Sequence, residues 1–367
     1  MSPHLVSVLL PVYNAERYLI AAIESILRQD CPHLELIAID DGSTDNSLAI
    51  LERYRKTDDR ITLVSRENRG LIATLNEGLA MARGDLIARM DADDIAYPTR
   101  LSRQVALFDQ QPQLAICSTG VDRLLGRRIL SGAPDPIYWQ CSLRILSNFF
   151  TIFIHPTVVY NRRVIPQDVL FYDASYVHAE DFDLFRRITE RFEAAMIADS
   201  LLAYRVHDES VTNKHKRPMR RTHLKIVVEN LTREALVADA GVLLDIGKAV
   251  TMDTVRSAAR TILALGESIS AQPPETRPSY EEGALNLFYF LYQMIGDEQQ
   301  PQLTHEFLNR TAKWGKIRRR ERYGLRVGAL APQLSRLSIA ANKRFDAIAR
   351  HWQSIPASAI LQHQRST

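Results

Sequence analysis

The stretch Leu86-Ile87-Ala88-Arg89-Met90-Asp91-Ala92-Asp93-Asp94 joins an apolar-leaning run to three carboxylates within four residues. A short apolar run of this kind is typical of a buried strand, and the acidic residues mark its end. Carboxylates crowded in this way repel one another unless a cation neutralises them or their pKa values rise. Hard divalent ions take oxygen ligands of this kind, often together with the phosphates of a substrate. The stretch therefore predicts a strand that ends in a metal–nucleotide site.

Strand and helix patterns alternate around this stretch. Apolar runs predict strands at 6–10, 34–39 and 61–64, and apolar residues at helical spacing predict helices around 19–27, 48–54, 71–79 and 101–108. The expected helix boundaries are Asn14 as cap of the first helix, Ser43 or Thr44 as cap of the second, Gly84 at the end of the third and Pro98 at the start of the fourth. This order predicts an α/β fold, with a mostly parallel sheet covered by helices on both faces.

Polar or turn-forming residues follow three of the predicted strands. These segments are Pro11-Val12-Tyr13-Asn14, Asp40-Asp41-Gly42-Ser43-Thr44-Asp45 and Asp91-Ala92-Asp93-Asp94. In open parallel sheets the ligand lies beyond the carboxyl ends of the strands. Three segments far apart in the sequence therefore predict one binding rim.

The rest of the chain is less regular and then helical. A helix is predicted from Glu180 to Arg191, with strands near 194–198 and 201–206. Further helices are expected at 222–240, 252–265, 281–295 and 303–320, with a proline-rich linker at 271–279. We therefore expect a catalytic domain over residues 1–215 and a predominantly helical C-terminal extension over residues 216–367.

Composition indicates the setting of the protein. Among 367 residues, 46% are hydrophobic and 24% are charged, which is typical of a soluble globular chain. Cys31, Cys117 and Cys141 are odd in number and widely spaced, so they predict a reducing compartment rather than a disulfide framework. The N-terminus lacks the pattern of a signal peptide, and no apolar run approaches the roughly 18 residues that span a bilayer. We therefore expect a cytoplasmic protein.

Charge is distributed unevenly along the chain. The net charge is +3, but the residues from 301 onward contain 13 Lys and Arg against 3 Asp and Glu. The segments Lys313–Arg322 and Lys343–Phe345 mix basic residues with aromatic or aliphatic ones, which suits peripheral contact with anionic lipid at the inner face of the membrane. A solvated helical face, or a helical domain that packs on the catalytic body or on another subunit, is the competing explanation. No nucleic-acid-binding module accompanies the charge.

The ordered motifs of this chain resemble those of a known family. The motifs are Val6–Asn14, Asp40–Asp45, Glu67–Gly70, Asp91–Asp94, His155–Thr157, Ala179–Asp181 and Tyr204–His207. In this order they resemble family-2 glycosyltransferases of the GT-A fold, a Rossmann-like architecture of nucleotide-diphospho-sugar transferases. The resemblance covers residues 5–210 and implies an inverting transfer of a sugar from a nucleotide-diphosphate donor, assisted by Mn²⁺ or Mg²⁺.

The resemblance also implies a donor site. It places Pro11, Tyr13 and Glu16 around the nucleobase, Asp41 as acceptor from the N3–H of uracil, and Arg69 near the base or phosphates. Taken alone, Asp40–Ser43 is equally typical of a turn followed by a helix cap.

For the acidic cluster, the resemblance implies that Asp93 binds the metal and that Asp91 contacts the ribose or the metal. If strand geometry continued, Asp91 and Asp93 would lie on the same face. Asp94 is expected to support the ligands or cap the following loop, and a solvated acidic loop is the alternative for the whole cluster. His207 matches a histidine that completes metal or diphosphate coordination in some members, although a lone histidine is more often structural.

Inversion requires a base on the face of the sugar opposite the leaving group. The resemblance selects Asp181 as this base, with Glu180 orienting the acceptor or a neighbouring group. The alternative is a charge pair favoured by the N-terminus of a helix. A helix N-terminus lowers the pKa of a carboxylate, so we expect burial to offset that effect in a working base. His155 is expected either to line the acceptor pocket or to hold a turn.

The resemblance implies an enzyme that adds one or a few sugars to a saccharide or lipid-linked saccharide, in a bacterial surface-polysaccharide pathway. UDP is the expected nucleotide. The arginine motif of processive membrane synthases is not evident after Asp181. Two alternatives stay open: a nucleotidyltransferase acting on sugar phosphates, and a catalytically silent module that binds nucleotide sugars.

Overall fold

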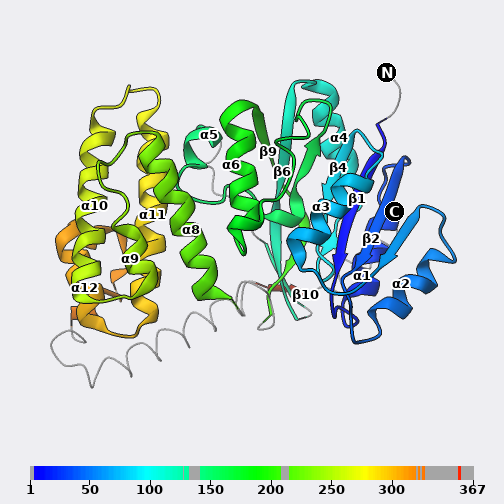
Figure 1. Cartoon of the computed structure of the whole chain (residues 1–367), viewed down its shortest axis with the longest axis horizontal. Coiled ribbons are helices and arrows are strands. Elements are labelled where there is room, and N and C mark those ends of the chain that lie inside the picture. Colours follow the sequence, from blue (N-terminus) through cyan, green and yellow to red (C-terminus); the bar gives the residue numbers. More distant parts are fainter. Residues whose placement is uncertain are drawn as a thin grey trace. The chain divides into compact units, whose positions relative to one another are not determined.

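The computed structural model describes residues 4–126, 128–131, 141–207, 215–319, 321–322, 325–326 and 354–356. Their contacts group into two compact units, coloured along the chain in Figure 1. One unit contains all the strands with helices α1–α4 and α6, and the other contains α5 and α8–α12. The domain division expected near residue 215 stays a prediction.

The first unit is built on a mixed sheet. Its strands are β1 Val6–Val12, β2 Leu34–Asp40, β3 Ile61–Ser65, β4 Leu86–Arg89, β5 Ile95–Ala96, β6 Leu114–Leu125, β7 Arg128–Leu130, β8 Val159–Asn161, β9 Glu193–Arg205 and β10 Ser354–Pro356. The order is β10-β7-β6-β8-β4-β1-β2-β3, with β9 beside β6 and β5 beside β9. Strands β4, β1, β2 and β3 run parallel, whereas β8 runs antiparallel to β4 and β6. The predicted α/β class and its parallel core are therefore confirmed.

Helices cover both faces of the parallel strands. The helices of this unit are α1 Leu19–Leu27, α2 Ser47–Arg55, α3 Leu71–Met81, α4 Arg100–Gln110 and α6 Glu180–Arg191. Side chains of α1, α2 and α4 share one hydrophobic core with the alternate residues Val8 and Leu10 of β1. Helix α3 lies on the opposite face, where a Cβ added at Gly78 would meet Leu9 at 3.2 Å. Because successive side chains of a strand point to opposite faces, burial on both sides explains why these strands are almost wholly apolar.

The predicted helix boundaries in this unit need correction. Helix α1 begins after Tyr18 without a side-chain cap, and the Asn14 side chain instead accepts a hydrogen bond from the Thr44 amide at 2.7 Å. The first amide of α2 donates to Asp45 rather than to Ser43 or Thr44. Helix α3 ends at Met81, before Gly84, and α4 begins two residues after Pro98. Polar residues at these loops bind one another across the chain, so local capping rules do not apply to them.

The helical unit consists of α5 Leu143–Leu146, α8 Lys216–Arg233, α9 Leu243–Lys248, α10 Met252–Ser270, α11 Arg277–Asp297 and α12 Pro301–Thr311. Figure 1 shows α10, α11 and α12 side by side, and all three pack against one another. The helix predicted at 222–240 ends at Arg233, and the one predicted at 303–320 ends at Thr311, because Ala312 adopts a left-handed conformation. The two strands predicted between 194 and 206 form the single irregular strand β9. No helix in the described part of the chain is long and apolar enough to cross a bilayer.

Gly84 is required by a close approach between the turn before β4 and the start of β1. A Cβ at this position would lie 2.5 Å from the Leu5 carbonyl oxygen and 2.8 Å from the Ser7 amide nitrogen. The Gly84 amide also donates to the Ser7 hydroxyl at 2.8 Å. We expect Gly84→Ala to lower the free energy of unfolding by about 1–3 kcal/mol, because backbone atoms cannot yield as a flexible side chain does.

Chemical denaturation of Gly84→Ala and of Gly266→Ala measures this effect with a matched control. Gly266 lies inside α10, where an added Cβ meets nothing within 4 Å. Alanine at that position is expected to leave stability unchanged or raise it by up to about 1 kcal/mol. If Gly84→Ala were as stable as the wild type, the close approach would not be a constraint.

Candidate active site

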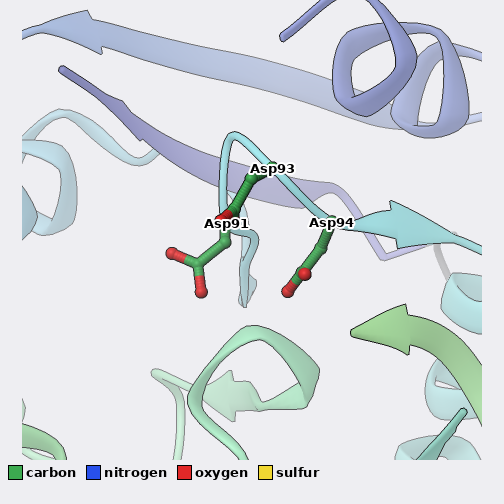
Figure 2. Close-up of side chains that lie close together, drawn as sticks. All are labelled: Asp91, Asp93 and Asp94. Atoms are coloured by element: carbon green, nitrogen blue, oxygen red, sulfur yellow. The ribbon is translucent and has the colours of Figure 1, made fainter. Parts of the chain in front are cut away.

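Three aspartates gather in the loop between β4 and β5. Strand β4 ends at Arg89, and a tight turn carries Asp91, Asp93 and Asp94. Figure 2 shows the three side chains pointing to the same side of this loop, and one ligand atom from each lies within 4.8 Å of the others. Strand geometry does not continue through the cluster, so the turn, and not strand alternation, brings the carboxylates together.

The end of β9 supports this acidic loop. The Arg205 amide donates to Asp94 at 2.7 Å, and the Arg205 Nε donates to the Asp93 carbonyl oxygen at 2.6 Å. His207 Nε2 lies 2.8 Å from an Asp93 carboxylate oxygen. Asp91 forms an ion pair with the buried Arg89. The structure therefore brings Asp93 next to both Asp91 and His207, and the metal and ribose contacts expected for these residues stay a prediction.

The acidic cluster fits a divalent cation. Desolvation, together with the negative charge of Asp91, raises the pKa of Asp93 above its usual range and raises that of Asp94 further. Among the described residues, Asp94 Oδ2 is buried and has no hydrogen-bond partner. Three clustered carboxylates with an unsatisfied buried oxygen are suitable oxygen ligands for Mg²⁺ or Mn²⁺. A bound cation would relieve the repulsion that raises these pKa values.

Two loops at the neighbouring strand ends are locked together by hydrogen bonds. The Asn14 amide donates to the Ser43 hydroxyl at 3.0 Å, and the Glu16 carboxylate accepts from both the amide and the side chain of Asn46. Pro11 lies within β1, and Tyr13 in the following loop is 55% exposed. This arrangement leaves an accessible aromatic side chain on a rigid loop at the rim of the sheet.

Asp41 organises the next segment of the rim. Its buried carboxylate forms an ion pair with Arg66 and accepts from the Arg69 amide at 2.8 Å and the Gly70 amide at 2.9 Å. The backbone of Arg69 is thus held next to Asp41, while its side chain is exposed. These bonds give Asp41 a structural role in addition to the base contact expected for it, which stays a prediction.

Tyr18 connects the rim to the acidic loop. The Arg205 guanidinium lies 4.1 Å from the centre of the Tyr18 ring, and the His207 ring lies 5.6 Å from it. Sequence reasoning did not assign roles to Tyr18, Arg66 or Arg205, because each acts by contact with a residue far away in the chain. For Arg89 a signal existed: a charged residue inside an apolar strand pattern is unusual unless it is paired.

A pair of carboxylates lies at the start of α6. Glu180 is buried, while Asp181 is partly exposed and accepts from the Phe182 amide at 2.8 Å. Desolvation raises the pKa of Asp181 to about 6 and that of Glu180 to about 7, with the Asp181 charge adding to the latter. A carboxylate poised near neutral pH is suited to accept a proton. Burial of Asp181 therefore offsets the lowering of its pKa by the helix N-terminus, as a working base requires.

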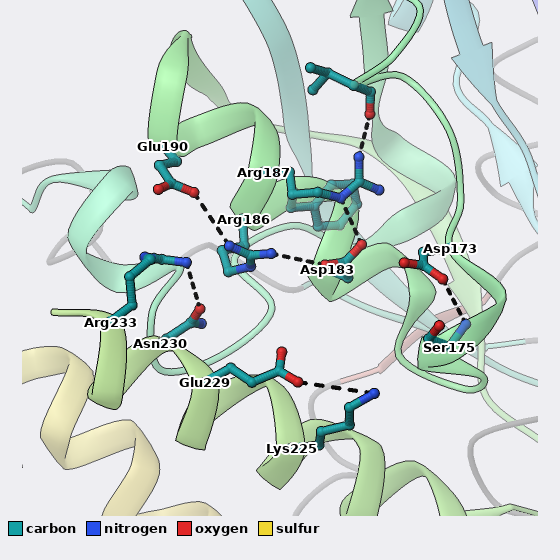
Figure 3. Close-up of polar contacts among 12 residues, drawn as sticks. Asp173, Ser175, Asp183, Arg186, Arg187, Glu190, Lys225, Glu229, Asn230 and Arg233 are labelled. Atoms are coloured by element: carbon teal, nitrogen blue, oxygen red, sulfur yellow. Dashed lines mark hydrogen bonds and ion pairs between the residues drawn. The ribbon is translucent and has the colours of Figure 1, made fainter.

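Ion pairs fix the first turns of α6. Figure 3 shows Arg186 and Arg187 both directed at the buried Asp183, at 3.1 and 2.8 Å. Arg187 also donates to the carbonyl oxygens of Val169 and Phe171, each at 2.5 Å. These contacts attach the segment before α6 to the helix and so restrain the backbone on both sides of Asp181.

His155 contributes to the same region. It is the first residue of a short 3₁₀ helix, η2 His155–Thr157, and its Nε2 lies 2.8 Å from the Tyr172 hydroxyl. Desolvation, with the charge of Arg89, lowers its pKa well below the usual range. His155 thus lies in a turn and contacts Tyr172, and the choice between the two roles expected for it stays a prediction.

The parallel core, the polar rim at its carboxyl ends and the acidic loop form the architecture expected of a glycosyltransferase of the GT-A fold. The chain belongs to glycosyl transferase family 2, whose sequence model matches residues 7–207.

Three relatives illustrate the similarity. An uncharacterized glycosyltransferase of Haemophilus influenzae is 31% identical over 239 residues, which are 62% of this chain and 73% of that protein. The putative glycosyltransferase EpsE of Bacillus subtilis is 43% identical over 36% of this chain and 50% of its own length. Chondroitin synthase of Escherichia coli is 28% identical over 62% of this chain but 33% of its own length.

Two solved structures share the fold. Residues 1–349 of TarS from S. aureus, in complex with UDP-GlcNAc, align with a TM-score of 0.52 and 18% identity over 81% of this chain and 92% of that one. The mannosyltransferase PcManGT from Pyrobaculum calidifontis, in complex with GDP-Man and Mn²⁺, aligns with a TM-score of 0.51 and 17% identity over 86% and 88%.

Proposed function

We propose that this glycosyltransferase moves a sugar, with inversion, from a UDP-sugar to a hydroxyl of a saccharide or lipid-linked saccharide. The observation that carries the proposal is the pairing of two separate acidic groups, Asp91–Asp94 at the end of β4 and Glu180–Asp181 at the start of α6. An inverting transfer needs one group for the leaving diphosphate and another for the attacking hydroxyl. Family membership favours this function over a nucleotidyltransferase or a silent binding module.

The donor would lie along the rim. Tyr13 and Pro11 would contact the nucleobase, Asp41 would accept from its N3–H, and Arg69 would approach the base or the phosphates. The locked loops support this role, because a rigid rim loses little conformational freedom when a ligand binds. The UDP-GlcNAc complex of TarS, which shares the fold, is compatible with a UDP donor.

A divalent cation would be held by Asp93 with His207, and Asp91 would contact the ribose or the same ion. When bound, a Mn²⁺ or Mg²⁺ ion neutralises the charge that the departing nucleoside diphosphate gains. Arg205 and Tyr18 would orient this group of ligands, since both contact the acidic loop or His207.

Asp181 would remove the proton from the acceptor hydroxyl, while Glu180 orients the acceptor or Asp181 itself. A surface-polysaccharide pathway fits the polysaccharide context of the chondroitin synthase relative. Contact of the C-terminal region with anionic lipid at the inner membrane face is proposed from its positive charge. Lys316, Arg318 and Arg319 are exposed, but Lys343–Phe345 lies outside the described residues.

A thermal-shift screen of nucleotide sugars tests the donor assignment. A ligand that binds only the folded state stabilises it, by about 2.7 kcal/mol at 100 times its dissociation constant. We expect a UDP-sugar to raise the melting temperature more than the GDP-sugars, and to do so more strongly with Mn²⁺ than with EDTA. Equal stabilisation by UDP- and GDP-sugars would contradict the UDP assignment, and equal shifts with Mn²⁺ and EDTA would contradict the metal requirement.

A further inference from the structure

Arg89 is a buried cation at the junction of the site. It is the last residue of β4 and only 3% exposed. Its amide donates to the Val158 carbonyl oxygen at 3.0 Å, and its own carbonyl oxygen accepts from Arg100 at 2.8 Å. Its guanidinium forms an ion pair with Asp91. Burying a guanidinium is costly unless it is paired, so a position like this one requires a compensating anion.

A buried network of aromatic side chains lies on the face of the sheet to which Arg89 points, and it extends toward α6. Ile87 pairs with Tyr160 in the antiparallel ladder of β4 and β8, so Tyr160 lies on the face of the sheet to which Arg89 also points. The Tyr160 hydroxyl lies 3.0 Å from that of Tyr172, which lies 2.8 Å from His155 Nε2.

The same contacts continue into helix α6. The His155 ring meets the edge of Phe185, with ring centres 6.0 Å apart. Asp181 and Phe185 are four residues apart in α6 and therefore lie on the same face of that helix. The face of α6 that carries Asp181 is thus the one that packs over the buried network.

The charges around Asp181 are mostly negative. The negative charge of Asp91 in the acidic loop opposes the ionisation of Asp181, and Glu180 on the same helix competes with Asp181 to be ionised. The hydrogen bond from the Phe182 amide favours the ionised form of Asp181. The hydroxyls of Tyr160 and Tyr172 also interact with Asp181, and His155 beside them is held neutral. Of these groups, Arg89 alone carries a positive charge, and it favours the ionised forms of both Glu180 and Asp181.

We propose that Arg89 is a positioning residue shared by the two acidic groups: it forms an ion pair with Asp91 and supplies the buried positive charge that favours the ionised form of Asp181. This inference rests on the proposed function of Asp181 as base. Desolvation already raises the pKa of Asp181 to about 6, so without a nearby positive charge this base would stay protonated to higher pH. Arg89 would thereby keep Asp181 ionised for the acceptor reaction and hold Asp91 in place on the donor side.

The test compares the pH dependence of thermal stability in Arg89→Met, Arg89→Lys and Asp91→Asn, each with and without Asp181→Asn, in EDTA between pH 4 and 9. Because the pKa of Asp181 is higher in the folded protein than in the unfolded chain, its contribution to stability falls as pH rises to about 6 and is constant above that value. Subtracting the Asp181→Asn curve gives the contribution of Asp181 together with its effect on the neighbouring Glu180.

In Arg89→Met, the pH above which this difference curve becomes constant is expected to rise by about one to three units. This is the usual shift when an opposite charge near a carboxylate is lost. Arg89→Lys is expected to restore the wild-type position. Asp91→Asn is expected to move the plateau to lower pH, because it removes a negative charge and leaves Arg89 unopposed. Asp91→Asn therefore also tests the proposal if Arg89→Met does not fold.

An unchanged plateau in Arg89→Met or in Asp91→Asn would overturn the proposal, as would a shift that persists when Asp181 is replaced. Hydrolysis of UDP-GlcNAc with water as acceptor and Mn²⁺ present supplies the catalytic readout. The acid limb of the pH–rate profile for this hydrolysis is expected to move to higher pH in Arg89→Met, and a limb at the wild-type pH would overturn the proposal. If no nucleotide sugar were cleaved or transferred by the wild type while the plateau moved as expected, the proposed function would fail and the electrostatic role of Arg89 would stand.

Discussion

Asp181→Asn is expected to lower the rate of sugar transfer by about 10²–10⁴-fold, the range for loss of a general base, with donor binding almost unchanged. Asparagine preserves the shape of the side chain and can still accept from the Phe182 amide, but it cannot accept the proton of the attacking hydroxyl. The pKa of about 6 further predicts that wild-type activity falls as pH drops below that value, because Asp181 is then protonated.

Initial rates at saturating donor, together with calorimetric titration of UDP, separate these two effects. Glu190→Gln is a matched control, since Glu190 lies at the far end of α6 and pairs with Arg186 at 3.3 Å. Its transfer rate should equal that of the wild type. Transfer by Asp181→Asn at the wild-type rate would remove Asp181 from the chemistry, and an equal loss of UDP affinity would indicate a general disturbance of the site.

Asp93→Ala is expected to weaken UDP binding in the presence of Mn²⁺ by about 100-fold, which corresponds to about 2.7 kcal/mol. The reason is that the ion that would neutralise the diphosphate loses a ligand. The substitution removes a carboxylate from the acidic cluster and also the partner of His207. Binding without metal should not weaken, because the substitution also removes a negative charge that repels the diphosphate.

Titration of UDP with and without Mn²⁺ measures this difference. Asp199→Asn is the control for the loss of one negative charge, since Asp199 is exposed and pairs with Arg103 at 2.5 Å. It should retain the metal dependence of the wild type. If Asp93→Ala retained that dependence, the ion would be held elsewhere.

The order of motifs was sufficient to predict the family and the parallel core. Strand β2 shows why: its seven residues, Leu34–Asp40, are all buried, so the sequence pattern records the environment directly. Helix α6 also begins at Glu180 and ends at Arg191 as predicted, because its apolar face repeats at helical spacing. Local patterns were less informative at Asn14 and Ser43, whose partners lie about 30 residues away.

By itself, the sequence determined the family and the places of its polar motifs: a carboxylate cluster after β4, a second carboxylate pair at α6 and a polar rim after β1 and β2. Residue type and spacing are local properties, so they can be read without coordinates. Only the tertiary structure decided the electrostatics. It placed Arg89 against Asp91 and directed the Asp181 face of α6 onto the Tyr160–Tyr172–His155 network, and it desolvated Asp181 enough to raise its pKa to about 6. Desolvation and long-range charge depend on what surrounds a group in space, and no short stretch of sequence encodes that environment.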